Sequence, residues 1–295
     1  MNKATSLILV GIFYLFAYAI GFFFSFLMKN YLDLYINLFL GTIISTIAIY
    51  LFNLLFKNAS LYDPYWSVQP CYLIFCFYII YGDKYPFNPI HLIVLLPLLF
   101  WAIRLTINWG NGFSDMSFED WRYKMLKEKT TNRVLRELTV LMGIMIIPTI
   151  CVYLGTAPLF TSFMKEGVNQ LLFYIIGATI ILLGTILQIV SDYQMLKFRK
   201  QKTGKNIDTG LWKYSRHPNY LGELLIWTGV FIASLNHFDI INIFGVLTIY
   251  FLFFSISIPM AEKRYLNKYV EYQDYKKRTS MLLILPKRKP KEYSK

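Results

Sequence analysis

Long runs of apolar residues with almost no charge recur along the whole chain, and they limit its fold more than any other feature. A helix of about twenty such residues crosses the ~30 Å hydrocarbon core of a bilayer. The chain is 56% hydrophobic, against about 45–50% in soluble domains. We therefore predict an all-α, polytopic membrane bundle of about eight transmembrane helices. The expected spans are approximately 6–28, 34–56, 65–81, 89–108, 138–158, 171–191, 221–236 and 240–260.

Lysine and arginine are concentrated in three segments, with six in 109–137, seven in 192–220 and eleven in 261–295, together 24 of the 30 in the chain. Cytoplasmic loops carry such an excess, and eight spans put all three segments on one side. We predict that both termini face the cytoplasm and that amphipathic helices lie on this surface. The charge also favours anionic membrane lipids, whereas no soluble basic domain is present to bind nucleic acid.

The three cysteines, Cys71, Cys76 and Cys151, all lie within expected spans. None has a histidine or acidic neighbour at the spacing of metal ligands. Packing explains them, so we predict neither a metal site nor a disulfide framework.

Polar residues at the edge of a membrane span are costly to place there, which makes them functional candidates. Gln188, Asp192, Met195 and Arg199 follow one another at i, i+4, i+7 and i+11, so they share one face of a helix. This face leaves the sixth span on the basic side. Capping and solvation of a helix end is the other explanation for Asp192 and Arg199.

A second group of polar residues lies in the sequence GLWKYSRHPNYLGE, at 210–223. Pro218 fits the first turn of the seventh span, and basic groups beside free backbone N–H groups bind anions. These features indicate a nucleotide-like cofactor with its phosphates toward the cytoplasm and its ring between helices. An interfacial belt of aromatic and basic residues would not explain Glu223. The candidate residues here are Arg216, His217, Asn219, Tyr220 and Glu223.

The C-terminal segment continues the pattern, because Glu262, Tyr265, Tyr269 and Tyr272 recur at steps of three and four residues. Such an aromatic stripe is more often packing than the wall of a cofactor site. Here it lies on the same side of the membrane as the other two polar groups, so we expect all three to converge.

The order of these segments resembles the steroid 5-alpha-reductase-like superfamily, and most closely its bacterial branch, described only as a domain of unknown function. The resemblance rests on SDYQMLKFRK, GLWKYSRHPNYLGE and EKRYLNKYVEYQDYKKRTS in this order, preceded by DPYWS at 63–67 and EDWRY at 119–123. It covers about 60–286. R-H-P-x-Y alone is less specific, because isoprenylcysteine and phospholipid methyltransferases share it.

The resemblance implies a membrane reductase that uses NADPH to saturate a C=C bond conjugated to a carbonyl, or a sterol-like alkene. Arg199, Arg216 and nearby lysines would be partners for a 2′-phosphate, because a guanidinium binds phosphate bidentately. The implied cofactor contacts are Gln188, Asp192, Arg199, Asn219, Tyr220, Glu223 and Tyr265, with Arg216 and His217 beside them.

The proton donor is less well defined by the sequence. Enone reduction needs a donor that polarises the carbonyl oxygen, and the family takes it from a carboxylate and a tyrosine on earlier spans. Many relatives carry Arg-Leu-x-x-His on the fourth span, where this chain has Asn108 four residues after Arg104. The catalytic candidates are Asp63, Arg104 and Glu119, each of which also fits a surface or topological charge.

We therefore expect a reductase acting on a steroid, sterol, isoprenoid or similar lipid enone. One integral membrane domain would occupy 1–286, with variable spans over 1–62 and a reductase-like core over 63–286, followed by a basic tail at 287–295. The alternatives are an S-adenosylmethionine-dependent methyltransferase of a lipid or prenylcysteine, and a lipid-binding or transport protein. The Ile-, Lys-, Asn- and Phe-rich composition indicates a bacterial plasma membrane, and a eukaryotic protein of this kind would lie in the endoplasmic reticulum.

Overall fold

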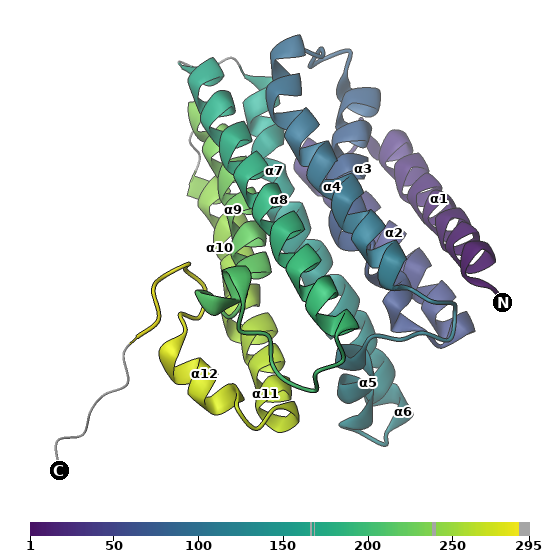
Figure 1. Cartoon of the computed structure of the whole chain (residues 1–295). Coiled ribbons are helices and arrows are strands. Elements are labelled where there is room, and N and C mark those ends of the chain that lie inside the picture. The colour runs from purple at the N-terminus through teal and green to yellow at the C-terminus, as the bar shows by residue number, and fades with distance from the viewer. Residues whose placement is uncertain (166, 168, 238–239, 289–295) are drawn as a thin grey trace.

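The computed structural model describes residues 1–295 apart from 166, 168, 238–239 and 289–295 (Figure 1). Helices make up 79% of the chain and no β-strand occurs among the described residues, which confirms the predicted all-α class. Within the same residues, six helical stretches are long and apolar enough to cross a membrane, as in a multi-pass membrane protein. The first two are α1 (Lys3–Met28) and α2 (Leu34–Phe56), and the fifth is α8 (Gln170–Lys200). The third, Pro89–Gly112, contains α4 (Leu92–Gly112), and the fourth, Arg133–Met164, runs from α6 (Arg133–Leu138) to α7 (Ile147–Met164). The sixth, Asn242–Lys268, contains most of α10 (Ile240–Leu252) and all of α11 (Ile258–Lys268).

The other two expected spans form helices that are shorter than a membrane is thick. α3 (Tyr65–Tyr81) has 17 residues and α9 (Pro218–Ala233) has 16, which gives roughly 24–26 Å at 1.5 Å per residue. α9 packs on α7, α8 and α10, and α3 packs on α4 and α7. Both thus pack among longer helices, and the expected count of about eight spans is not confirmed. α9 does begin at Pro218, as predicted.

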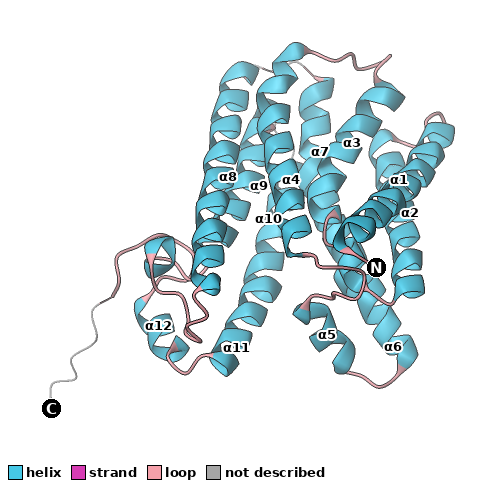
Figure 2. Cartoon of the chain, turned by 45° about the vertical axis from the view of Figure 1, so that its right-hand side comes forward, coloured by secondary structure: helices cyan, strands magenta, loops and turns pink. Residues whose placement is uncertain are grey.

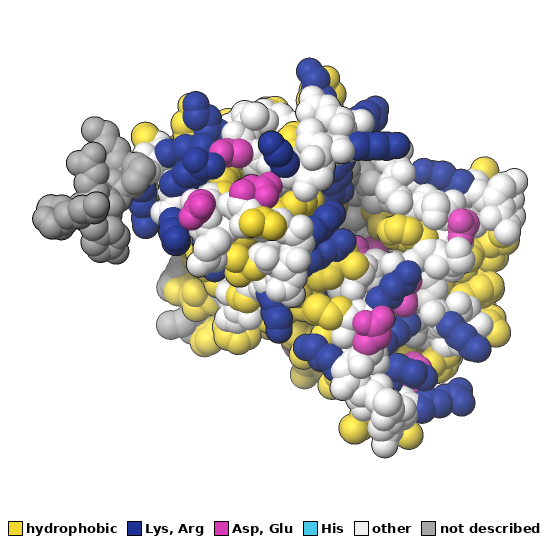
Figure 3. All heavy atoms as spheres, turned by 60° about the horizontal axis from the view of Figure 1, so that its bottom comes forward, with side chains coloured by type: hydrophobic (Ala, Val, Ile, Leu, Met, Phe, Trp, Pro, Cys, Tyr) yellow, Lys and Arg dark blue, Asp and Glu magenta, His cyan; other side chains and the backbone are white. Residues whose placement is uncertain are grey.

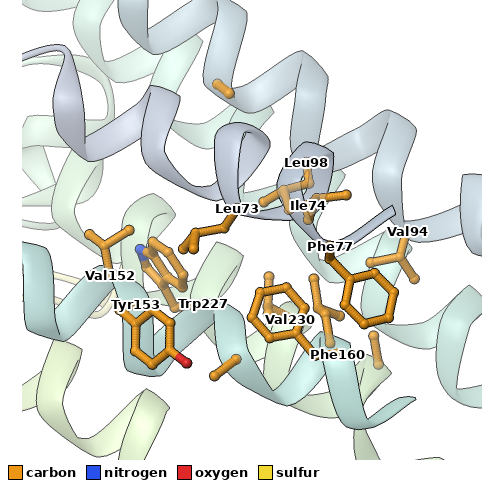
Figure 4. Close-up of a cluster of buried hydrophobic side chains, with 14 of the residues drawn as sticks. Leu73, Ile74, Phe77, Val94, Leu98, Val152, Tyr153, Phe160, Trp227 and Val230 are labelled. Carbon is orange, nitrogen blue, oxygen red and sulfur yellow. The ribbon is translucent and has the colours of Figure 1, made fainter. Parts of the chain in front are cut away.

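The two short helices supply much of the central core (Figure 4). Leu73 and Phe77 of α3 face α7, where the Phe77 and Phe160 rings stack with centroids 5.3 Å apart. Trp227 and Val230 of α9 belong to the same cluster. Because lipid tails are as apolar as these side chains, close packing rather than escape from water holds such a core together.

The N-terminus, α5 (Trp121–Glu128), α6, α11 and α12 (Tyr272–Arg278) lie at one end of the bundle (Figures 1 and 2). Figure 3 shows Lys and Arg side chains spread over this end, which we call the basic face.

The helices at the basic face differ from those expected from the sequence. Only α5 forms a separate surface helix in 109–137, because Arg133 already begins the stretch that continues into α7. The C-terminal helix is likewise broken between Lys268 and Tyr272.

The C-terminal segment folds back onto the loop between α8 and α9. The Ser215 hydroxyl donates to the Leu282 carbonyl at 2.6 Å, and Asp208 pairs with both Arg278 at 2.8 Å and Lys287 at 2.7 Å. Lys287, the first residue of the expected basic tail at 287–295, is thus attached to this loop. Residues 289–295 lie outside the described part of the chain.

We predict that the basic face is cytoplasmic and that Lys165, between α7 and α8, lies on the other side. In a variant without native cysteines, a cysteine at position 165 should react with a membrane-impermeant maleimide added outside intact cells. A cysteine at the exposed Lys202 position should react only after permeabilisation. Labelling of position 165 from the cytoplasmic side alone would contradict this topology.

Candidate functional site

The carboxylate of Glu223 is the centre of a polar network inside the bundle. Its Oε1 accepts hydrogen bonds from the indole N–H groups of Trp66 at 2.7 Å and Trp227 at 3.0 Å. Its Oε2 accepts from the Trp101 indole at 3.1 Å and from Gln188 Nε2 at 2.5 Å. These donors come from α3, α9, α4 and α8, so one carboxylate joins four helices. It is 4% exposed, and all its donors are neutral.

The network continues toward the basic face through side chains of α8 and α4. The Gln188 Oε1 atom accepts from Arg104 Nη1 at 3.0 Å. The other guanidinium nitrogen of Arg104 forms an ion pair with Asp192. Asp192 lies one turn beyond Gln188 on α8, and a quarter of its side chain is exposed. Three residues predicted to be functional therefore form one chain of contacts with Glu223.

Close approach of α8 and α9 makes the Gln188–Glu223 contact possible. A side-chain carbon on Gly177 would come within 2.5 Å of the Gly229 carbonyl oxygen, and one on Gly184 within 2.6 Å of the Gly222 carbonyl oxygen. Both positions thus require glycine, because even a methyl group would push the helices apart. Small residues at such contacts allow membrane helices to pack backbone to backbone.

Arg216 fixes the loop before α9 to the C-terminal elements. Its Nε and Nη2 atoms donate to Glu262 of α11 at 2.8 and 2.7 Å, and its Nη1 donates to the carbonyls of Lys276 and Thr279 at 2.7 and 2.9 Å. Lys276 also pairs with Glu262 at 2.7 Å. This guanidinium is therefore engaged with the protein itself, although the residue lies at the edge of the cavity described below.

His217 lies beside this ion pair and is 2% exposed. Its ring stacks on Tyr220 with centroids 5.2 Å apart, and its Nε2 atom is 3.5 Å from Glu262. Burial lowers the pKa of His217, while the nearby Glu262 carboxylate opposes this effect. The neutral imidazole is thus favoured, and its ring supports the Tyr220 ring by stacking on it.

A cavity of about 180 Å³ opens where α8 ends, between the loop that follows it and the helices α11 and α12. Arg199 and Tyr265 lie in its wall, as does Arg216. Its other cationic residues are Lys202, Lys205 and Lys268, and its other tyrosines are Tyr269, Tyr272 and Tyr275. No described carboxylate lines it, and none lies within 4.0 Å of Arg199 or these lysines, although Asp192 and Glu271 are near enough to interact electrostatically with Arg199 and Lys205, respectively. The cavity therefore combines an excess of positive charge with aromatic surface.

A second acidic group lies between α2 and α3, where Asp63 accepts a hydrogen bond from the Tyr123 hydroxyl of α5. The Arg122 guanidinium is 3.8 Å away. Burial raises the pKa of Asp63 to about 6, against the opposing effects of Arg122 and Tyr123. Asp63 can therefore change its protonation state near neutral pH, and Tyr123 is positioned to share the proton.

Glu119, the third catalytic candidate, makes contacts that hold two loops together. Its carboxylate accepts the backbone N–H of Ala59 at 2.8 Å and pairs with Lys127 at 2.5 Å. Asn58 holds the same loop by donating to the carbonyls of Met116 and Phe118. Glu119 thus ties the α4–α5 connection to the short helix η1 (Ala59–Tyr62) before Asp63.

Tyr220 lies between the two acidic groups. It is close enough to experience the charges of Arg122 and Asp120 on one side and of Asp192 on the other, and it also interacts with Tyr265. The neighbouring Asn219 side chain is half-buried and has no hydrogen-bond partner among the described residues. The structure therefore brings the candidates Asp192 of α8 and Tyr265 of α11 near Tyr220 of α9, whereas Glu119 makes its contacts elsewhere.

Sequence reasoning missed the indole partners of Glu223 and the tyrosine partner of Asp63. A signal for the indoles was present, because Trp66 and Trp101 lie within apolar spans and a buried indole N–H requires an acceptor. The lysines of the cavity, Lys202 and Lys205, were grouped only as nearby basic residues. Their convergence depends on how the loop after α8 turns back.

The fold and the site are those of a multi-pass helical membrane protein with a basic, aromatic cavity at one end of the helix bundle. The chain belongs to the family described as "Protein of unknown function (DUF1295)", which matches residues 49–279. It is also similar to the uncharacterized protein C594.04c of Schizosaccharomyces pombe, with 25% identity over 74% of this chain and 70% of the yeast protein. No solved structure was found to be similar. The family match contains every site residue named above.

We predict that Glu223 is required for the fold. Glu223→Gln places an amide N–H₂ against two hydrogen-bond donors, and each lost bond to a charged group costs about 1.5–3 kcal/mol. Glu223→Leu leaves four donors unpaired and should destabilise the protein more. Melting curves of the purified variants without cofactor should show a lower Tm in this order, whereas the exposed Glu128→Gln should melt like the wild type. A wild-type melting curve for Glu223→Leu would contradict this role.

Proposed function

We propose that this protein is an NADPH-dependent membrane reductase that saturates a C=C bond conjugated to a carbonyl in a lipid such as a steroid, sterol or isoprenoid. The observation that carries the proposal is the cavity at the end of α8, where an excess of positive charge meets several tyrosine rings. The order of the motifs around it resembles the steroid 5-alpha-reductase-like superfamily, which supports the same class of reaction.

The phosphate groups of NADPH fit the basic part of this cavity. Arg199, Lys202, Lys205 and Lys268 form no ion pair within 4.0 Å with a described carboxylate, and Arg199 can bind a phosphate bidentately. Arg216 is expected from the sequence to bind phosphate. It is less suited to this role than Arg199, because its donors are engaged with Glu262 and two backbone carbonyls. Tyrosine rings of the same cavity offer flat surfaces on which an adenine can stack.

The nicotinamide end of the cofactor would extend from this cavity toward Asn219 and Tyr220. NADPH supplies a hydride to the β-carbon of the substrate when it is bound. We assign Glu223 to support of this region rather than to cofactor contact, because four protein donors already occupy its carboxylate. Through Gln188 and Arg104 it holds Asp192 in place at the border of the site.

Asp63 and Tyr123 are the proposed source of the proton. As charge develops on the carbonyl oxygen of an enone, a hydrogen-bond donor at that oxygen stabilises the enolate. Tyr123 can donate to the substrate while it receives a proton from Asp63, whose pKa of about 6 leaves it partly protonated near neutral pH. The resemblance implies a carboxylate and a tyrosine on earlier spans as the donor groups, whereas here Asp63 precedes α3 and Tyr123 lies on α5.

The alternative of a methyltransferase would place S-adenosylmethionine in the same cavity. This cofactor contains an adenosyl group but no phosphate. Its one anionic group is the methionine carboxylate, which can pair with only one or two of the cationic residues of the cavity, whereas the diphosphate and 2′-phosphate of NADPH would neutralise more of them. The charge of the cavity therefore favours the reductase.

We predict that Arg199→Ala weakens NADPH binding roughly tenfold to a hundredfold, because one hydrogen bond to a charged group contributes about 1.5–3 kcal/mol. NADH, which lacks the 2′-phosphate, should lose much less. Dissociation constants of both cofactors can be measured by isothermal titration calorimetry of the purified protein. Lys200→Ala is the matched control, because Lys200 is the next residue of α8, is exposed and does not line the cavity.

Equal weakening of NADPH binding and NADH binding in Arg199→Ala would show that Arg199 does not bind the 2′-phosphate. The same loss in Lys200→Ala would show that general surface charge, rather than the cavity, attracts the cofactor. Retention of full NADPH affinity by Arg199→Ala would count against the cofactor cavity as a whole.

A further inference from the structure

A second cavity, of about 430 Å³, lies at the end of the bundle away from the basic face. Its walls come from the α3–α4 connection, residues 84–91, and from the turn after α7 together with the start of α8. Figures 1 and 2 show these connections at the opposite end from α5, α11 and α12. It is therefore separate from the proposed cofactor cavity and has no role in the function proposed above.

Among the described residues that line this cavity, Lys84 and Lys165 are charged and none is a carboxylate. Neither lysine forms an ion pair within 4.0 Å with a described residue, although Asp83 and Glu166 are their neighbours in the sequence. Lys84 lies over the Tyr85 ring, with its Nζ atom 5.2 Å from the centroid. Phe87 and Phe163 add further aromatic surface. An anion with an attached apolar part matches this combination.

His91 supplies a buried polar group to the same cavity. It is 3% exposed, its ring stacks on Phe163 with centroids 4.4 Å apart, and its Nδ1 atom is 2.6 Å from the Tyr78 hydroxyl. In the tautomer in which this hydroxyl donates to Nδ1, the ring proton lies on Nε2. No hydrogen bond joins Nε2 to a described residue. In this tautomer His91 therefore offers a donor without a partner among the described residues.

The position of the cavity indicates where its ligand comes from. α4 begins at Leu92 and α7 ends at Met164, and both belong to stretches that can cross the membrane. The cavity therefore lies at the level where spanning helices end and lipid headgroups begin. Basic pockets between membrane helices bind lipid headgroups, and aromatic side chains are favoured at this depth.

We propose that this cavity binds the phosphate group of an anionic phospholipid, in the leaflet opposite the cofactor cavity. Lys84 and Lys165 pair with the phosphate, and His91 Nε2–H donates to an oxygen of the lipid. The first part of the glycerol backbone lies against Phe87 and Phe163. The site holds the α3–α4 connection to the α7–α8 turn.

Lipid binding to the purified protein tests this proposal without any measurement of reductase activity. Native mass spectrometry should show that the wild type retains phosphatidylglycerol in preference to phosphatidylcholine. The double variant Lys84→Gln/Lys165→Gln should bind phosphatidylglycerol roughly tenfold or more weakly, since each lysine near an anionic lipid contributes about a fivefold change in affinity. Lys29→Gln is the matched control, because Lys29 also lies over an aromatic ring between two spans but does not line the cavity.

A parallel titration with glycerol 3-phosphate distinguishes the two sources of phosphate. Tight binding of this soluble compound would overturn the lipid source, whereas binding only of the intact lipid would support it. Equal phosphatidylglycerol affinity in the double variant and in Lys29→Gln would overturn the site itself. Equal retention of phosphatidylcholine and phosphatidylglycerol by the wild type would do the same. Both lysines are exposed, so the variants should fold.

Discussion

A carboxylate inside a membrane bundle is stable only when its charge is well hydrogen-bonded, and Glu223 meets this requirement with donors from four helices. None of these donors is charged, so the network keeps a net negative charge at its centre. Gln188 connects Glu223 to the end of α8, because its side-chain oxygen accepts a hydrogen bond from Arg104 and Arg104 forms an ion pair with Asp192. The polar residues at the membrane border are therefore ordered by an interaction that lies deeper in the bundle.

This arrangement depends on two short helices and on glycine. α3 and α9 are short helices that run between the two ends of the bundle and pack among longer ones. The glycine pairs between α8 and α9 bring Gln188 to Glu223 and fix the end of α8 beside the loop that carries Arg216. Arg216 then attaches α11 and the C-terminal segment, and the basic cavity forms where these elements meet.

The sequence predicts the all-α class, the start of α9 at Pro218 and the shared face of Gln188, Asp192 and Arg199, because these follow from local patterns of apolar residues and helical spacing. It does not predict that the tyrosine stripe breaks after Lys268, since the break depends on packing against a distant loop. The sequence also does not predict the different environments of Glu119 and Asp63. Asp63 begins DPYWS and Glu119 begins EDWRY. Only the tertiary fold decides that Glu119 pairs with Lys127 and that Asp63 contacts Tyr123.

The most direct test of the proposed reductase is a comparison of two cofactors on the purified protein. Titration with NADPH and, separately, with S-adenosylmethionine should be followed by the shift in Tm, because a ligand that binds the folded state raises it. We expect NADPH to raise the Tm in a saturable manner and S-adenosylmethionine to leave it unchanged. A rise with S-adenosylmethionine and none with NADPH would contradict the account and assign the cavity to a methyltransferase.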